Sequence, residues 1–406
     1  MMVLLAASLC RGMSGVRAVI PEQIARMLNA GLTPVVPSVG SVGASGDLAP
    51  LAHIALTLIG EGSIIHLGKT VPAAEALAAA NLSPITLEAK EGLALINGTH
   101  LMAAQGALVV HDAERAFDAA LTAAAMSIDA CRGTDAFLDE RVHAARNQPG
   151  QHYVAGQLRE RLRGSQIIPS HRENDPRVQD PYSLRCMPQV LGAACDCLGY
   201  VKQAVARELG AVTDNPLVFA GEDQGVVSAG NFHGMPLAIP LDALTIALSH
   251  IAGISERRTF WMLSNFDPEA RLKPYLSPAP GLNSGLMIAQ YTAAACCNEI
   301  ISLATPASPA NVVTSAGIED YNSFGPRAAA KARRALELVE TVVAIELMCA
   351  AQGLEYHRPL RSGDRVEKAH ARIRERVPPL HEDRVLATDI ESVLSLVRDG
   401  ALVSDV

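Results

Sequence analysis

The sequence predicts an all-α protein built around a bundle of long helices, and three observations support this. Hydrophobic residues make up 49% of the 406 residues, but only 4% are aromatic and alanine is abundant, a composition that favours buried helices over sheets. Apolar residues recur at spacings of three and four over several long segments. Loops rich in Pro, Asp and Gly separate these segments.

Residues 1–95 are predicted to form an N-terminal segment around a glycine-rich loop, and residues 96–406 to form the central helical bundle with the C-terminal helices. This is the simplest division, because the sequence contains no internal repeat and no low-complexity linker. The apolar run at residues 1–10 lacks the positive charge of a secretory signal peptide.

Five long helices are predicted, in chain order, at residues 100–130, 187–209, 237–264, 283–304 and 326–353. In the last of them Leu336, Val339 and Val343 recur at three and four, and its other faces carry apolar residues as well. A helix that is apolar nearly all round belongs inside a bundle. Loops are expected at residues 132–151, 163–182, 213–234, 266–282 and 305–326.

Charge and cysteine usage exclude several classes of function. The net charge is -8, and the only dense basic run, residues 372–376, is interrupted by glutamate, so nucleic acid is not an expected partner. The eight cysteines include no Cys-x-x-Cys pair, which argues against a metal site and fits reduced thiols in a cytoplasmic protein. The longest apolar stretch, residues 237–254, contains Asp242 and His250, so no membrane partner is expected.

The most informative run of the chain is residues 40–51, which contains the tripeptide Ala44-Ser45-Gly46. In a tight loop the amide nitrogen of Gly46 can attack the carbonyl carbon of Ala44, because glycine has no Cβ to block the approach. Loss of two waters, the second from the Ser45 side chain, leaves 4-methylideneimidazol-5-one (MIO), an uncharged electron sink. Taken alone, the same residues also fit a glycine-rich turn whose Asp47 caps a helix. The spacing fits neither a nucleophile elbow nor a phosphate-binding loop.

A second polar segment, residues 178–185, places Gln179, Tyr182 and Arg185 just before a predicted helix. An arginine fork holds a carboxylate through two parallel hydrogen bonds, so this segment is a candidate for binding a substrate carboxylate. The alternative is an ordinary surface turn. Three further candidates have structural alternatives of their own: Asn97 as a helix cap, Phe232 as a core residue and Glu319 as a surface acid.

Five spaced motifs between residues 35 and 325 together resemble the aromatic amino-acid ammonia-lyase family, and within it the histidine ammonia-lyases. They are the Ala-Ser-Gly loop, the Gln-Asp-Pro-Tyr-Ser-x-Arg segment, and the segments at residues 90–99, 228–234 and 314–320. The resemblance implies an L-aspartase/fumarase-like lyase fold, MIO formed autocatalytically from Ala44, Ser45 and Gly46, and no metal or nucleotide. It also implies a homotetramer whose sites are shared between subunits and accept a small amino-acid substrate.

The resemblance assigns a role to each candidate side chain. Asn97 is expected to donate a hydrogen bond to the MIO carbonyl, Tyr182 to lie beside the electrophile, and Phe232 to pack on it. Gln179 is expected to line the site, Arg185 to bind the substrate carboxylate, and Glu319 to face the substrate ring. In the implied mechanism the electrophile captures the amine, or alternatively the substrate ring, and so eases the departure of ammonia. A positioned base then removes the β-proton.

Three details favour L-histidine as the substrate, with urocanate and ammonia as products. Glu319 and His233 stand where phenylalanine lyases have glutamine, and Ser-Glu-Arg-Arg follows at residues 255–258. A carboxylate suits an imidazole ring, which donates a hydrogen bond or carries charge near neutral pH. Asn322, in contrast, is the residue of phenylalanine lyases. A phenylalanine or tyrosine ammonia-lyase, or an aminomutase of the family, is therefore the alternative.

The start of the chain departs from the family pattern. Upstream of the Ala-Ser-Gly loop, family members carry a mobile loop with a catalytic tyrosine and then a Ser-His segment, and the sequence contains neither. The first residues align with the middle of a family helix, so we expect a truncated form or a start codon assigned too late. The alternative is that the chain is not an enzyme but an inactive subunit that lacks the tyrosine loop.

Overall fold

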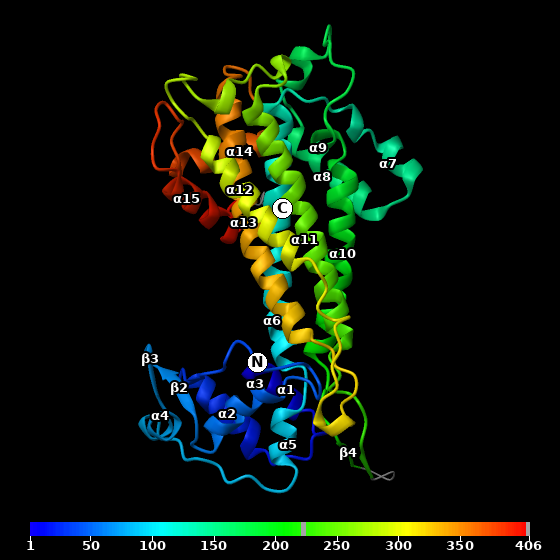
Figure 1. The fold of residues 1–406 in the computed structure, drawn as a ribbon, viewed down its shortest axis with the longest axis vertical. Helices are drawn as coiled ribbons and strands as arrows, with labels where there is room; N and C mark the ends of the chain where they lie inside the picture. Colours follow the sequence, from blue (N-terminus) through cyan, green and yellow to red (C-terminus); the bar gives the residue numbers. More distant parts are fainter. Residues whose placement is uncertain (221–224, 403–406) are drawn as a thin grey trace. The chain divides into compact units, whose positions relative to one another are not determined.

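The computed structural model describes residues 1–220 and 225–402, and helices dominate it (Figure 1). The chain forms two compact units, each assembled from three stretches of sequence. Unit 1 comprises Met1–Val109, Val201–Ala243 and Pro306–Lys331. Unit 2 comprises Val110–Tyr200, Leu244–Thr305 and Ala332–Val406. The division predicted at residue 95 stays a prediction. It cuts the sequence at one point, whereas each of these units combines segments that pack together from different parts of the sequence.

The α-helices are, in chain order, α1 (Met2–Leu9), α2 (Val19–Asn29), α3 (Leu48–Leu58), α4 (Ala73–Ala79), α5 (Glu91–Ile96), α6 (His100–Ala130), α7 (Glu140–Arg146), α8 (Pro149–Leu162), α9 (Tyr182–Arg185), α10 (Met187–Leu209), α11 (Met235–Ser264), α12 (Met287–Leu303), α13 (Gly325–Glu355), α14 (Asp364–Arg376) and α15 (Leu386–Arg398). Short 3-10 segments lie at Ala136–Leu138, Ile168–His171, Pro268–Ala270, Pro274–Leu276 and Ser315–Gly317. The predicted all-α class is confirmed, and the five predicted long helices correspond to α6, α10, α11, α12 and α13.

Several bounds differ from the predictions, among them the start of α12 and the loops expected at residues 132–151 and 213–234, the second of which contains β4 (Leu217–Phe219) and β5 (Gly225–Val227). Helix α12 begins at Met287 rather than at residue 283, because Asp383 accepts hydrogen bonds from the backbone N–H groups of Ser284 and Gly285 at 2.7 and 2.9 Å. The predicted loop at residues 132–151 is wrong in part, because it contains α7 and the start of α8. The Asp139 side chain caps α7 by accepting a hydrogen bond from an N–H of the first turn.

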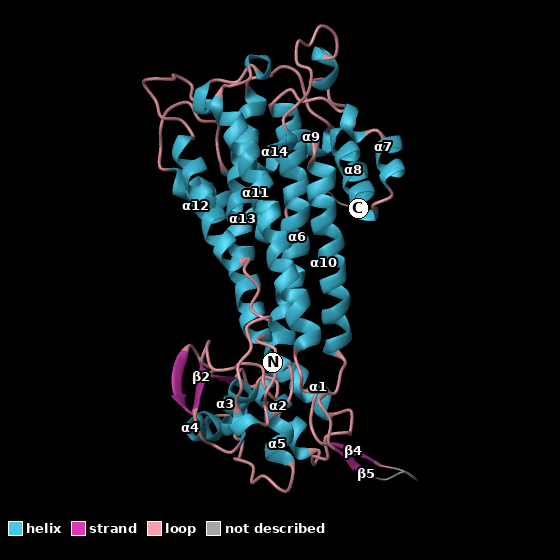
Figure 2. Cartoon of the chain, turned by 45° about the vertical axis from the view of Figure 1, so that its right-hand side comes forward, coloured by secondary structure: helices cyan, strands magenta, loops and turns pink. Residues whose placement is uncertain are grey.

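Strands are short in both sheets that the structure describes (Figure 2). In unit 1, β1 (Thr33–Pro34), β2 (Ser63–His66) and β3 (Lys69–Pro72) form an antiparallel sheet. A second antiparallel pair consists of β4 (Leu217–Phe219) and β5 (Gly225–Val227).

The hydrophobic core of unit 1 includes the helix that directly follows the Ala-Ser-Gly loop. Leu5 of α1 and Ile20 and Ile24 of α2 are completely buried, and Leu51 and Ile54 of α3 join the same hydrophobic cluster. Helix α3 begins at Leu48, directly after the loop. Burial of its apolar side therefore anchors the end of the loop by the hydrophobic effect.

The core of unit 2 contains a completely buried ion pair. The guanidinium of Arg258 binds both carboxylate oxygens of Glu346, and both side chains are 0% exposed. The hydroxyls of Ser127 and Ser255 each donate to the same carboxylate at 2.6 Å. Ser255 and Arg258, read from the sequence as a sign of substrate preference, therefore have a structural role in the bundle.

Helix α11 is the one helix in the described parts of the chain that is long and apolar enough to cross a membrane. In the structure 67% of its apolar window is buried. A buried helix in the core of a bundle can be as long and as apolar as a membrane-spanning helix. Helix α11 fits this description, because it carries Arg258 of the buried ion pair.

Candidate functional site

The Ala-Ser-Gly tripeptide lies in unit 1, in a tight loop held against residue 98. Gly46 has a φ of +77°, in the left-handed region that favours glycine, and a Cβ added there would lie 2.2 Å from the carbonyl oxygen of Gly98. The Asp47 backbone N–H donates to the same oxygen at 2.7 Å. Ala44 and Gly46 are buried, whereas Ser45 is partly exposed. The loop thus has the tight, side-chain-free backbone that the sequence predicts.

Glu319 faces this loop although it lies far away in the sequence. The hydroxyl of Ser45 donates a hydrogen bond to Oε1 of Glu319 at 2.8 Å across 274 residues of chain. The hydroxyl of Thr314 donates to the other oxygen, Oε2, at 2.9 Å. The carboxylate is therefore oriented from one side by Thr314 and presents its second oxygen to Ser45.

The segment that carries Glu319 lies along the Ala-Ser-Gly loop. The Phe324 backbone N–H donates to the Val42 carbonyl oxygen at 3.0 Å. The Ser323 hydroxyl donates to the carbonyl oxygen of Gly43 at 3.2 Å. These contacts set the distance between Ser45 and Glu319 through the backbone. Neither Thr314 nor Ser323 was singled out from the sequence, because a lone hydroxyl carries no local signal of such a contact.

Asp47 caps a helix, but not the one that follows it in sequence. Its Oδ2 accepts hydrogen bonds from the backbone N–H groups of Leu101 and Met102, in the first turn of α6, at 2.8 and 3.2 Å. Burial raises the pKa of Asp47 to about 7, although the two N–H donors lower it. The loop is thereby tied to α6 as well as to α3.

Asn97 and Phe232 also belong to unit 1. Asn97 ends α5 next to Gly98, is buried, and donates from its side-chain amide to the Leu93 carbonyl oxygen at 3.3 Å. With this contact Asn97 caps the end of α5, which is the structural role that the sequence also allowed. Its hydrogen bond to the MIO carbonyl stays a prediction. Phe232 is partly buried and precedes His233, whose ring stacks on the ring of Tyr321 with centroids 6.4 Å apart.

Asn322 has a structural explanation. Its backbone N–H donates to Oδ1 of Asn311, and the Asn311 amide donates back to its carbonyl oxygen, both at 2.8 Å. Its own amide donates to the Val312 carbonyl oxygen at 2.6 Å, and the residue is 0% exposed. The side chain braces the segment that carries Glu319, so it does not argue for a phenylalanine substrate.

The second predicted cluster comes together in unit 2. Nη2 of Arg185 donates to Oε1 of Gln179 at 2.6 Å, and its Nε donates to the Asp180 carbonyl oxygen at 2.9 Å. The guanidinium carbon lies 4.6 Å from the centre of the Tyr182 ring, which is exposed. All these residues line a cavity of about 650 Å³ whose other walls include Trp261 and Phe266. The structure therefore brings Gln179, Tyr182 and Arg185 together at one cavity.

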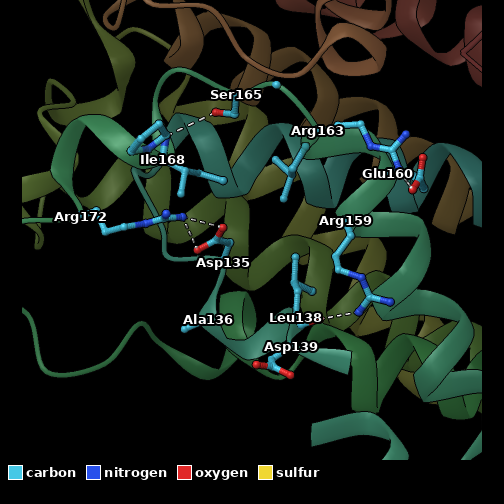
Figure 3. Close-up of a pocket in the computed structure, with 13 residues that line it drawn as sticks. Asp135, Ala136, Leu138, Asp139, Arg159, Glu160, Arg163, Ser165, Ile168 and Arg172 are labelled. Atoms are coloured by element: carbon cyan, nitrogen blue, oxygen red, sulfur yellow. Dashed lines mark hydrogen bonds and ion pairs between the residues drawn. The ribbon is translucent and has the colours of Figure 1, made fainter. Parts of the chain in front are cut away.

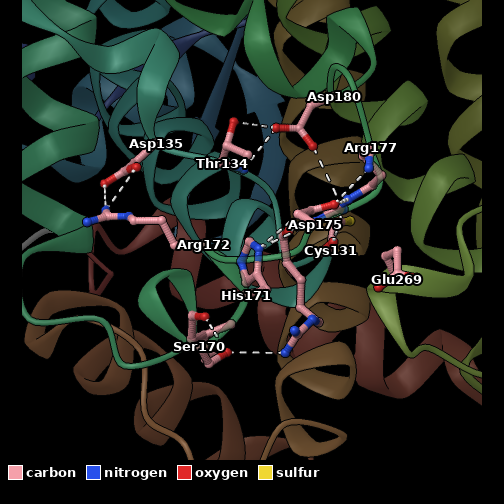
Figure 4. Close-up of polar contacts among 12 residues, drawn as sticks. Cys131, Thr134, Asp135, Ser170, His171, Arg172, Asp175, Arg177, Asp180 and Glu269 are labelled. Atoms are coloured by element: carbon pink, nitrogen blue, oxygen red, sulfur yellow. Dashed lines mark hydrogen bonds and ion pairs between the residues drawn. The ribbon is translucent and has the colours of Figure 1, made fainter.

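The predicted site residues thus form one group within each unit. Unit 1 holds Asn97, Phe232 and Glu319 together with the loop of Ala44, Ser45 and Gly46, and unit 2 holds Gln179, Tyr182 and Arg185. The sequence missed a set of hydrogen-bonded polar residues beside the second group, among them the partly buried Asp175 and Arg177 and the exposed Thr134 (Figure 4). Isolated charged and polar residues in a loop give no indication of which of them will bind one another.

Another cavity of unit 2, of about 680 Å³, contains none of the predicted residues (Figure 3). Two of its arginines are paired with acids, Arg172 with Asp135 and Arg163 with Glu160, and Arg159 donates to the Leu138 carbonyl oxygen. Within residues 1–220 and 225–402 no group of three or more His, Cys, Asp or Glu side chains is arranged to hold a metal ion.

The family model of the aromatic amino acid lyases matches residues 1–375. The chain belongs to the aromatic amino acid lyase family. It is 50% identical over 410 residues to a histidine ammonia-lyase of Anaeromyxobacter sp. (strain K), covering 99% of this chain and 80% of the relative. The resemblance read from the sequence and the class of carbon-nitrogen lyase are confirmed.

Solved structures of the family share the fold. The structure of histidine ammonia-lyase from Trypanosoma cruzi matches with a TM-score of 0.91 and 41% identity, covering 99% of this chain and 76% of that one. A tyrosine aminomutase from Streptomyces globisporus matches with the same TM-score at 35% identity, covering 99% of this chain and 79% of that one. The helical lyase fold implied by the resemblance is therefore confirmed.

Proposed function

We propose that this protein is a histidine ammonia-lyase, which eliminates ammonia from L-histidine without oxidation and releases urocanate. The contact between Ser45 and Glu319 carries the proposal, because it places a carboxylate 2.8 Å from the serine hydroxyl of the loop. An imidazole ring can donate a hydrogen bond to that carboxylate, whereas a phenyl ring cannot. The similarity to histidine ammonia-lyases supports the same substrate.

The proposed electrophile is MIO formed from Ala44, Ser45 and Gly46, with no metal or nucleotide. The loop fits this group, because Gly46 packs against Gly98 with no side chain in the way of ring closure. MIO would supply an electron sink there, which would ease departure of the substrate amine. Loss of the Ser45 hydroxyl would release Oε1 of Glu319 from its present donor, while Thr314 still holds Oε2. Glu319 would then offer one oriented oxygen to the imidazole N–H.

The other candidate side chains take roles that follow from their chemistry. Arg185 and Gln179 are proposed to bind the substrate carboxylate, because an arginine fork and a neighbouring amide offer directed donors. Tyr182 is proposed to transfer a proton beside the electrophile. Asn97 and Phe232 are proposed to contact MIO itself.

We further propose that the protein is a cytoplasmic homotetramer with sites shared between subunits. Ile288, Tyr291 and Ile301 on α12 are exposed apolar side chains, which are typical of an interface. Helix α13 adds no such support, because Val339 and Val343 are completely buried within their own chain. Light scattering at micromolar concentration should therefore give four chain masses. A monomer would contradict the proposal.

Substrate preference tests the proposed reaction. The protein should form urocanate from L-histidine faster than cinnamate from L-phenylalanine or coumarate from L-tyrosine. Beside an apolar ring, Oε1 of Glu319 would lack the donor that an imidazole offers, and a charged oxygen left unpaired in a closed site costs on the order of several kcal/mol, enough for about a thousandfold preference. Preference for phenylalanine, or rearrangement of tyrosine to its β-isomer, would instead identify one of the other family activities. No turnover of any of the three would favour the inactive subunit.

The variant Glu319→Gln tests the role of the carboxylate. A hydrogen bond to a charged group contributes about 1.5–3 kcal/mol, so kcat/KM for L-histidine should fall by roughly ten- to a hundredfold. Turnover of phenylalanine should not fall in the same proportion. Asp320→Asn is a matched control, because Asp320 is the neighbouring exposed acid. Unchanged histidine turnover in Glu319→Gln would refute the assignment.

A further inference from the structure

We propose that Arg177 is a positioning residue for the substrate carboxylate, because it holds the backbone that places Gln179 and Arg185 side by side. This inference rests on the proposed function, in which those two residues bind the carboxylate. Arg177 lies two residues before Gln179, and its side chain is 14% exposed. Its guanidinium donates to residues other than Gln179 and Arg185, so it acts through the loop between them.

The donors of the Arg177 guanidinium are matched by five acceptors. Nε and Nη2 donate to the two carboxylate oxygens of Asp175 at 3.0 and 2.7 Å. Nη1 donates to Asp267 at 3.0 Å and to the Cys131 carbonyl oxygen at 3.4 Å. Nη2 also donates to the Arg132 carbonyl oxygen at 2.5 Å. Since arginine has five N–H donors in a rigid fork, every one of them has a partner.

These acceptors come from three separate stretches of unit 2. Cys131 and Arg132 follow the end of α6, Asp175 lies in the loop itself, and Asp267 follows the end of α11. Charge reinforces the arrangement, because the hydrogen bonds from Arg177 hold the pKa of Asp175 well below its usual range. Lysine offers a point charge without the fork, so it cannot replace all of these bonds.

A second contact fixes the loop three residues further on. Oδ2 of Asp180 accepts hydrogen bonds from both the backbone N–H and the hydroxyl of Thr134, each at 2.8 Å (Figure 4). Its Oδ1 lies 3.9 Å from Nη1 of Arg177. Gln179 therefore lies between two residues that are both tied to the end of α6.

The position of Arg185 depends on this fixed stretch of backbone. Its Nε donates to the carbonyl oxygen of Asp180, and its Nη2 donates to the side chain of Gln179. If the backbone of residues 177–180 is released, both anchors of Arg185 move. We therefore expect loss of Arg177 to weaken binding of a carboxylate specifically, with little effect on the substrate ring.

The variant Arg177→Met should raise KM for L-histidine by about tenfold or more and change kcat by less than about threefold, the pattern of lost uniform binding. Inhibition by urocanate, which carries the carboxylate, should weaken by a similar factor. Inhibition by histamine, which has the ring and amine but no carboxylate, should stay unchanged. Arg177→Lys should give an intermediate KM because it keeps the charge but not the fork.

Arg172→Met is the matched control, because Arg172 lies in the same loop region, is exposed and binds only Asp135 in the described part of the chain. Its KM should equal that of the wild type. If Arg177→Met does not fold, Asp267→Asn removes one of the acceptors instead and should raise KM in the same selective way.

Equal losses of urocanate and histamine binding would overturn the proposal, because they would indicate general damage to the fold. An unchanged KM in Arg177→Met would also overturn it. A wild-type preference for tyrosine or phenylalanine would refute the proposed substrate without affecting this test, because those amino acids carry the same carboxylate. The ratio of KM values would then be measured with the preferred amino acid, and with its deaminated product and its decarboxylated amine as the two inhibitors.

Discussion

Replacing Ser45 with alanine should abolish turnover of L-histidine, with a loss in kcat of at least about a thousandfold. Ser45 supplies the β-carbon of the proposed electrophile and one of the two waters that leave, and alanine has no hydroxyl to lose. A thousandfold loss corresponds to about 4 kcal/mol of transition-state stabilisation. Ser38→Ala is the matched control, because Ser38 is exposed in the same loop region and should leave turnover unchanged.

Intact-mass measurement separates loss of the electrophile from loss of the fold. The wild-type protein should be lighter than its encoded mass by two waters, and Ser45→Ala should lack this deficit. Gly46→Ala should lack it too even though Ser45 is present, because the added Cβ would lie 2.2 Å from the Gly98 carbonyl oxygen. Well-folded wild-type protein of unmodified mass would refute the proposed MIO.

Replacing Glu346 with glutamine should destabilise the protein by about 3–5 kcal/mol, the usual cost of breaking a buried ion pair. The carboxylate accepts four hydrogen bonds, from Ser127, Ser255 and twice from Arg258. Glutamine removes the charge and one acceptor, so it leaves the completely buried Arg258 guanidinium without compensation. Chemical denaturation followed by circular dichroism measures this loss as a lower free energy of unfolding.

Two further variants make the stability test specific. Glu337→Gln is the control on the same helix, because Glu337 pairs with exposed arginines and such pairs contribute about 0–1 kcal/mol. Combining Arg258→Met with Glu346→Leu should restore much of the stability lost in Glu346→Leu alone, because no unpaired charge remains in the core. A change below about 1 kcal/mol in Glu346→Gln would contradict the role of the ion pair.

The sequence by itself determines the helical class, the course of the long helices and the family. The apolar spacing that predicts α6 and α10 arises from side chains within a few residues of one another, so the information is local. The motifs that identify the family are local too, since the Ala-Ser-Gly loop and the segment of residues 178–185 are each continuous in sequence. The start of α12 escapes prediction because Asp383, which binds the N–H groups before it, lies 99 residues beyond Ser284.

Only the tertiary structure decides which polar side chains meet. Ser45 and Glu319 are separated by 274 residues, and Arg258 and Glu346 by 88. The type of a residue determines which hydrogen bonds its side chain can donate or accept. It does not determine whether that side chain faces a cavity or a buried partner. Asn322 and Arg258 illustrate this, because both were read as signs of substrate preference and both are buried among structural partners. Their surroundings follow from packing distant segments together, because burying a polar group is costly unless most of its hydrogen bonds are made within the protein.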